Sequence, residues 1–138
     1  MAIVVEARMA ALAPQTLAWF KSQISQSAPR TRIITACLEH GIPLILPMQW
    51  GVYQSAADRT AETQERLTDC EQYVLSAVCE YRLAQKQNAP EETLSFHARE
   101  LERTTDAYLR AKATAAASFA ETTDAYEALR QAILSLPD

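Results

Sequence analysis

Residues 91–136 read EETLSFHARELERTTDAYLRAKATAAASFAETTDAYEALRQAILSL, without a glycine or a proline. Along this stretch, apolar or small residues recur at alternating intervals of four and three, which places them on one face of an α-helix. They are Leu94, Ala98, Leu101, Thr105, Tyr108, Lys112, Ala115, Phe119, Thr122, Tyr126, Leu129, Ile133 and Leu136. Only one of them is charged. The spacing predicts a long helix over residues 90–135.

A second helix-forming stretch precedes this one. No glycine or proline occurs from Val52 to Ala89, and the same spacing selects another stripe. The stripe consists of Leu67, Cys70, Val74, Ala77, Tyr81 and Ala84, widened by Leu75 and Val78. Residues 55–58, Ser-Ala-Ala-Asp, have the form of a capping box, which places the helix start near residue 54. We predict a helix over residues 54–87.

The break between the two stretches is Asn88-Ala89-Pro90. Asn88 suits the cap of the following helix, and proline is accepted in a first turn. A turn this short makes the two helices antiparallel neighbours. The sequence therefore predicts a long helical hairpin whose second helix overhangs the first or bends near residues 113–117. The overhang, around residues 119–133, must be covered by the amino-terminal helices or by a second copy of the chain.

The first fifty residues predict short helices. One begins at Pro14 and continues to about Ser25, with an apolar stripe on one face. The stripe consists of Leu17, Phe20 and Ile24. Another helix begins at Thr31 and ends before Gly41, where a left-handed residue is expected. Residues 2–12 fit a helix or a strand, and the pattern leaves both open.

Residues 42–51 read IPLILPMQWG. Pro43 and Pro47 argue against a continuous helix here, yet the segment is strongly apolar. We predict an extended apolar strap. It either packs on the helices of its own chain or docks another chain.

Composition supports an all-α fold. The chain has 138 residues, of which 25 are alanine and only 2 are glycine, so it holds many helix formers and few turn formers. Its length suits a single domain over residues 1–138. Within that domain, residues 1–50 would form the short helices and the strap, and residues 51–138 the hairpin.

The residues exclude most catalytic chemistry. With two glycines, the chain contains no phosphate-binding loop, dinucleotide fingerprint or nucleophile elbow. Cys37 and His40 have the spacing of two metal ligands on one helical turn, but a core cysteine and a histidine at a helix end explain this pair without a metal. His97 flanks the predicted stripe and suits a packing role. We predict no catalytic residue, no bound metal and no cofactor.

Charge and cysteine usage indicate the surroundings. The net charge of −4 makes nucleic acid an unlikely partner. The three cysteines have no framework spacing, as is typical of a reducing compartment. The longest apolar run, Ile42–Met48, is far shorter than the roughly 20 residues of a membrane span. We expect a cytoplasmic protein, or one inside a particle assembled in the cytosol.

A thin hairpin with many small residues on its stripes gains stability from association, so we expect a homo-oligomer or a stable protein partner. The candidate interface residues are large apolar side chains on the helices and the strap. They are Trp19, Leu44, Leu46, Trp50, Phe119 and Tyr126. The first hypothesis is a non-enzymatic structural or adaptor subunit of a secretion apparatus, virion or cytosolic complex. The alternative is a small acidic inhibitor, of the immunity or antitoxin type, that blocks one partner.

Overall fold

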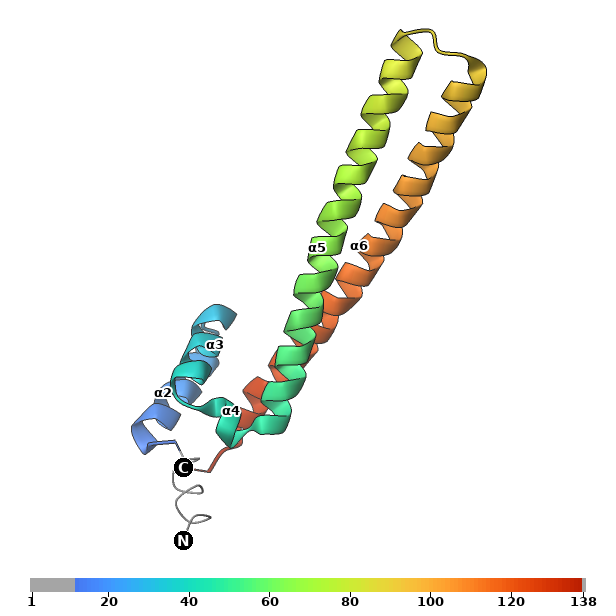
Figure 1. Cartoon of the computed structure of the whole chain (residues 1–138). Coiled ribbons are helices and arrows are strands. Elements are labelled where there is room, and N and C mark those ends of the chain that lie inside the picture. Colours follow the sequence, from blue (N-terminus) through green and yellow to red (C-terminus); the bar gives the residue numbers. More distant parts are fainter. Residues whose placement is uncertain (1–11, 138) are drawn as a thin grey trace. The chain divides into compact units, whose positions relative to one another are not determined.

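The computed structural model describes residues 12–137, and Figure 1 shows this part of the chain as helices joined by short turns. The helices are α2 (Pro14–Ser25), α3 (Arg30–Glu39), α4 (Ile42–Ile45), α5 (Pro47–Lys86) and α6 (Glu91–Leu134). No strand occurs among the described residues, and the predicted all-α fold class is confirmed. Residues 2–11, where helix and strand were both open, lie outside the described part. None of the described helices is both long and apolar enough to cross a bilayer.

The two short helices α2 and α3 agree with the sequence prediction. α2 starts at Pro14, whose missing N–H is not needed in a first turn, and it buries the predicted stripe of Leu17, Phe20 and Ile24. After α3, Gly41 takes φ 76°, the left-handed conformation that often ends a helix and that glycine adopts without the steric cost of a Cβ.

The extended strap predicted over residues 42–51 is wrong. The segment forms the single helical turn α4, breaks at Leu46 and continues directly into α5. Pro43 lies in the first turn of α4, and Pro47 is the first residue of α5. A backbone N–H at such a position has no helical carbonyl to donate to, so proline loses no hydrogen bond there. The two prolines therefore begin two helices in succession instead of preventing helix formation.

Helix α5 consequently begins at residue 47 and not near residue 54. The Trp50 N–H donates to the Leu46 carbonyl at 2.9 Å, which closes the first turn. Residues 55–58, the predicted capping box, lie inside the helix. With 40 residues in α5 and 44 in α6, the helices are nearly equal in length, so the expected overhang is wrong as well.

The turn between the long helices is built around Asn88, which takes φ 51°. Its N–H donates to the Gln85 carbonyl at 3.2 Å, and the Ala89 N–H donates to the Ala84 carbonyl at 3.0 Å. This pair of bonds defines a Schellman motif, in which a left-handed residue satisfies the last carbonyls of a helix. Asn88 thus ends α5, whereas the sequence predicted that it would cap α6.

The predicted antiparallel hairpin is confirmed (Figure 1). Between the two long helices, the Thr60 hydroxyl donates to the Ser118 carbonyl at 2.8 Å. The Arg59 guanidinium donates to the Glu121 carboxylate at 3.1 Å.

The chain divides into two compact units. The hairpin unit is Ala57–Glu121, and the terminal unit comprises the residues up to Ala56 together with those from Thr122 onward. Each unit contains parts of both long helices. The single domain over residues 1–138 remains a prediction.

The terminal unit holds the large side chains that are fully buried. These are Phe20, Ile33, Cys37, Ile42, Leu129 and Ile133. The end of α6 contacts the short helices here: Lys21 Nζ donates to the Leu136 carbonyl at 2.8 Å, and the Arg30 guanidinium lies 5.9 Å from the centre of the Tyr126 ring. The sequence left open whether the amino-terminal helices or a second copy of the chain would cover this end of α6. The structure shows contacts with the amino-terminal helices.

Candidate interaction surface

The six residues predicted to form an interface do not share one surface. Phe119 belongs to the hairpin unit and the others to the terminal unit. Leu44 is 70 % exposed and Trp19 is 38 % exposed, whereas Trp50 is only 9 % exposed. Leu46 and Tyr126 are half-buried. A role in an interface remains a prediction for each of them.

Trp50 and Tyr126 are brought together by an aromatic cluster inside the terminal unit. The Trp50 and Tyr53 rings lie 5.8 Å apart, and Tyr53 and Tyr126 lie 6.1 Å apart. The Trp50 indole N–H donates to the Gln54 side-chain oxygen at 3.2 Å, so its polar atom is satisfied. Burial raises the pKa of the Tyr126 hydroxyl. The cluster is part of the core that joins α5 to α6 in this unit.

In the hairpin unit, α5 presents the predicted stripe to α6, and every member of the stripe is buried or half-buried. The prediction that Leu75 widens this stripe is wrong, because the Leu75 side chain is 53 % exposed. On α6 the prediction fails at alternate positions: Ala98, Lys112 and Phe119 are exposed. The less exposed residue is in each case the one before, namely His97, Ala111 and Ser118.

The shift on α6 has a steric and an electrostatic reason. Ala111 and Ser118 are small, so they allow the close approach in which Thr60 bonds to a carbonyl of α6. The predicted register would have placed the Phe119 ring between the helices and buried the charge of Lys112. We call the inward residues of both helices the seam. They are Thr60, Thr63, Leu67, Cys70, Val74, Ala77, Tyr81 and Ala84 of α5, and Leu94, His97, Leu101, Thr104, Tyr108, Ala111, Ala115 and Ser118 of α6.

The seam buries only small side chains. Its buried members are Ala77, Ala84, Thr104, Ala111, Ala115 and Ser118. Large apolar side chains of the same unit are instead more than half exposed. They are Tyr73, Leu75, Leu83, Phe96, Leu109 and Phe119. The hairpin unit therefore buries no large apolar side chain completely, because its larger seam residues, such as Leu67, Leu101 and Tyr108, are only half-buried, and it presents six large apolar side chains to solvent.

The hairpin unit has two flanking faces. Successive helical residues turn by about 100°, so the residue before a seam residue and the residue after it point to opposite sides. The leading face consists of the residues that immediately precede seam residues, such as Arg66 and Arg110. The trailing face consists of those that immediately follow them, such as Thr68 and Leu109.

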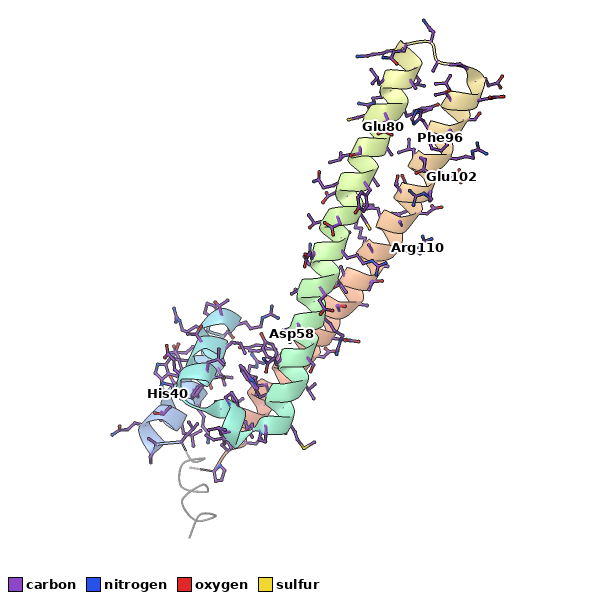
Figure 2. All side chains as sticks on the ribbon, viewed as in Figure 1. His40, Asp58, Glu80, Phe96, Glu102 and Arg110 are labelled. Atoms are coloured by element: carbon purple, nitrogen blue, oxygen red, sulfur yellow. The ribbon has the colours of Figure 1, made fainter. Side chains whose placement is uncertain are left out.

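The leading face is charged and carries a groove of about 300 Å³. The groove is lined by Thr63, Arg66, Cys70, Ala107, Arg110, Ala111 and Thr114. Among the described residues, Arg66 and Arg110 (the latter labelled in Figure 2) form no ion pair, although Glu62 and Asp106 stand four residues before them.

Some other charges of the leading face are paired. Arg103 donates to the Glu100 carboxylate at 2.8 Å, and this hydrogen bond lowers the pKa of Glu100. His97 Nδ1, on the seam, lies 3.8 Å from the carboxylate of Glu80 on α5. The Phe96 and His97 rings make an edge contact at 5.4 Å.

The candidate chemical groups differ in their surroundings. Cys37 is fully buried, and burial raises the pKa of its thiol to about 12, which suppresses the nucleophilic thiolate. His40, three residues later, is exposed, and its ring contacts the Phe20 ring at 6.0 Å. Over residues 12–137, no three side chains of His, Cys, Asp or Glu gather as a metal site would require.

No family model matches this chain, and neither a curated protein nor a solved structure shows significant similarity to it.

Proposed function

We propose that the protein is a non-enzymatic helical interaction module, a structural or adaptor subunit of a larger assembly. The observation that carries the proposal is the hairpin unit, which buries only small side chains completely and leaves six large apolar ones more than half exposed. We propose that this unit makes the contact with the partner. The three free cysteines favour the reducing cytoplasm as its location.

The physical argument concerns the area that two helices can bury alone. Burial contributes about 25 cal/mol per Å² of apolar surface, so the Ala, Ser and Thr side chains that the seam buries completely contribute little per residue. Most of the stability of a helix in a protein comes from packing an apolar face against other elements. The hairpin unit leaves such faces on both of its helices, which is typical of a surface completed by association.

The test measures mass and local stability together. Light scattering over a hundredfold concentration range gives the mass, and hydrogen exchange compares the amides of the two units. We expect a multiple of 15.3 kDa, with hairpin amides that become protected as association proceeds. A monomer with unprotected hairpin amides would also support the proposal, with a heterologous partner in place of self-association. A monomer whose hairpin is as protected as the terminal unit would overturn it.

Matched variants locate the contact. Leu75→Gln with Leu83→Gln removes exposed apolar area from the hairpin unit, and Leu44→Gln with Met48→Gln removes it from the terminal unit. We expect only the first pair to weaken association. The alternative function, an acidic inhibitor, instead requires capture of one basic protein and no self-association.

A further inference from the structure

We propose that the partner of the trailing face is a second copy of this chain, packed in antiparallel orientation about a two-fold axis to form a four-helix bundle. This inference deepens the proposed function and rests on it. Four observations carry it: the low charge of that face, the register of the hairpin, the positions of two opposite charges, and the size of the surface.

The trailing face is much less charged than the leading face. Between residues 57 and 121 its charged members are Glu71, Arg82, Glu102 and Lys112, two of each sign. The leading face carries Arg59, Glu62, Arg66, Asp69, Glu80, Glu100, Arg103, Arg110 and Glu121. A second copy docking on the trailing face therefore desolvates fewer charges and meets no net repulsion.

The register of the hairpin fixes which residues lie at the same height. The cross-helix pairs Arg59–Glu121, Thr60–Ser118 and Glu80–His97 have residue numbers that add up to 180, 178 and 177. Residue n of α6 thus lies at the level of about residue 178 − n of α5. Lys112 lies near level 66, and Leu109 lies near level 69.

The charges then define an axis. Among the described residues neither Lys112 nor Glu71 forms an ion pair within the chain. Each follows one seam residue and stands four residues after another, Leu67 for Glu71 and Tyr108 for Lys112, so both point toward the middle of the trailing face. A two-fold axis across the hairpin midway between them, near level 68 to 69, reverses the heights of the second copy. It brings Lys112 of each copy to the height of Glu71 of the other.

The same axis matches apolar side chains that were not used to place it. It lays α6 on α6 of the second copy, with Leu109 facing its own equivalent. It lays α5 on α5, with Leu75 facing the small Ala61 of the second copy. Across the middle it brings Phe119 to the height of Val78. One axis therefore pairs Lys112 with Glu71 and sets Leu109, Leu75 and Phe119 against apolar or small side chains.

The size of the surface is adequate. The overlap, from about level 57 to level 80, is about 36 Å long at 1.5 Å per residue, and two helices side by side are about 20 Å wide. Each copy would then contribute about 700 Å², close to the roughly 800 Å² per partner of a stable interface.

Disulfide trapping tests the orientation. In a background with Cys70→Ala and Cys79→Ser, we expect Leu109→Cys to form a cross-linked dimer on mild oxidation. The control, Ala117→Cys on the leading face of the same helix, should stay monomeric on a denaturing gel. A Leu109→Cys chain that links only to Thr68→Cys of another chain would overturn the proposal in favour of a parallel dimer. Efficient linking through Ala117→Cys would overturn it in favour of the leading face.

A charge exchange tests the pairing. Lys112→Glu alone and Glu71→Lys alone should each weaken the dimer about tenfold or more, because each places like charges together twice. The double variant should return to within about threefold of the original chain. A double variant as weak as the two single variants combined would overturn the pairing. Wild-type self-association with a failed cross-link would overturn this arrangement and leave the proposed function standing.

Discussion

The terminal unit and the hairpin unit use the same two long helices in opposite ways. In the terminal unit, the last turns of α6 bury Leu129 and Ile133 completely against the residues around them. In the hairpin unit, earlier turns of the same helix bury Ala111, Ala115 and Ser118 and leave Leu109 more than half exposed. Inward residues recur at intervals of three and four in both units. The terminal unit therefore buries large apolar side chains completely, whereas the hairpin unit buries only small ones completely.

The difference extends to the polar contacts. The hairpin unit is joined across its helices by the bond from Thr60 to the Ser118 carbonyl and by the exposed pair of Arg59 with Glu121. The terminal unit adds the Trp50–Tyr53–Tyr126 cluster to its apolar core.

The largest effect is expected for truncations of leucine on α6. Leu129→Ala removes a fully buried side chain and should lower the free energy of unfolding by about 2–5 kcal/mol. Leu109→Ala, on the same helix but 54 % exposed, should change it by about 0.5 kcal/mol or less in the dilute monomer. Urea unfolding at low protein concentration measures both. Equal losses would contradict the contrast between the units.

The second prediction concerns the cysteines. Cys37 in the terminal unit is buried with a thiol pKa raised to about 12, and Cys79 in the hairpin unit is exposed. A thiol reagent at pH 8 should modify Cys79 readily and Cys37 only after unfolding. In the unfolded chain the Cys37 thiol ionises near the ordinary thiol pKa of 9.0, so stability should fall as the pH rises from 9 toward 12.

Cys37→Ala is the control for this pH dependence. The variant lacks the titrating thiol, so its stability should fall less steeply over the same pH range. An identical slope in both proteins would assign the alkaline loss to other groups.

The sequence predicted the helices better than their mutual register. On α5 the predicted inward stripe was correct from Leu67 to Ala84, because most of the residues between its apolar positions are polar there. On α6, residues 111–117 offer a small side chain at most positions, so two neighbouring stripes fit the pattern equally. Only the packing against α5 selects Ser118 over Phe119.

Proline was the other source of error. Pro43 and Pro47 correctly excluded one continuous helix, but the same residues are favoured at a first turn, which makes two successive helix starts equally consistent with the pattern. The low charge of the trailing face could not be recognised from the sequence either. It becomes visible only when the seam is known, because a shift of one residue moves Lys112 from that face into the seam.

The third prediction compares two left-handed residues at helix ends. Ser27 ends α2 with φ 56°, and Asn88 ends α5 with φ 51°. The left-handed conformation costs an ordinary residue about 1–2 kcal/mol, and asparagine tolerates it better. Ser27→Gly should therefore stabilise the protein by about 0.5–1 kcal/mol, after the entropy of the unfolded glycine is counted. Asn88→Gly should be close to neutral. Thermal unfolding of both variants checks the order, and a larger gain at Asn88 would contradict it.

The smallest effect is expected for the exposed ion pair of the hairpin unit. The Arg59 and Glu121 side chains are 55 % and 59 % exposed, so water and salt screen their attraction. Glu121→Gln keeps the shape of the side chain and an oxygen that accepts a hydrogen bond, and should cost about 0.5 kcal/mol or less at low salt. The cost should vanish near 1 M salt, where the Debye length is about 3 Å. Urea unfolding of both proteins at the two salt concentrations measures it. A loss that persists at high salt would mean that this contact orders the hairpin through its geometry and not through its charge. The hairpin unit would then be more stable without a partner than its seam indicates.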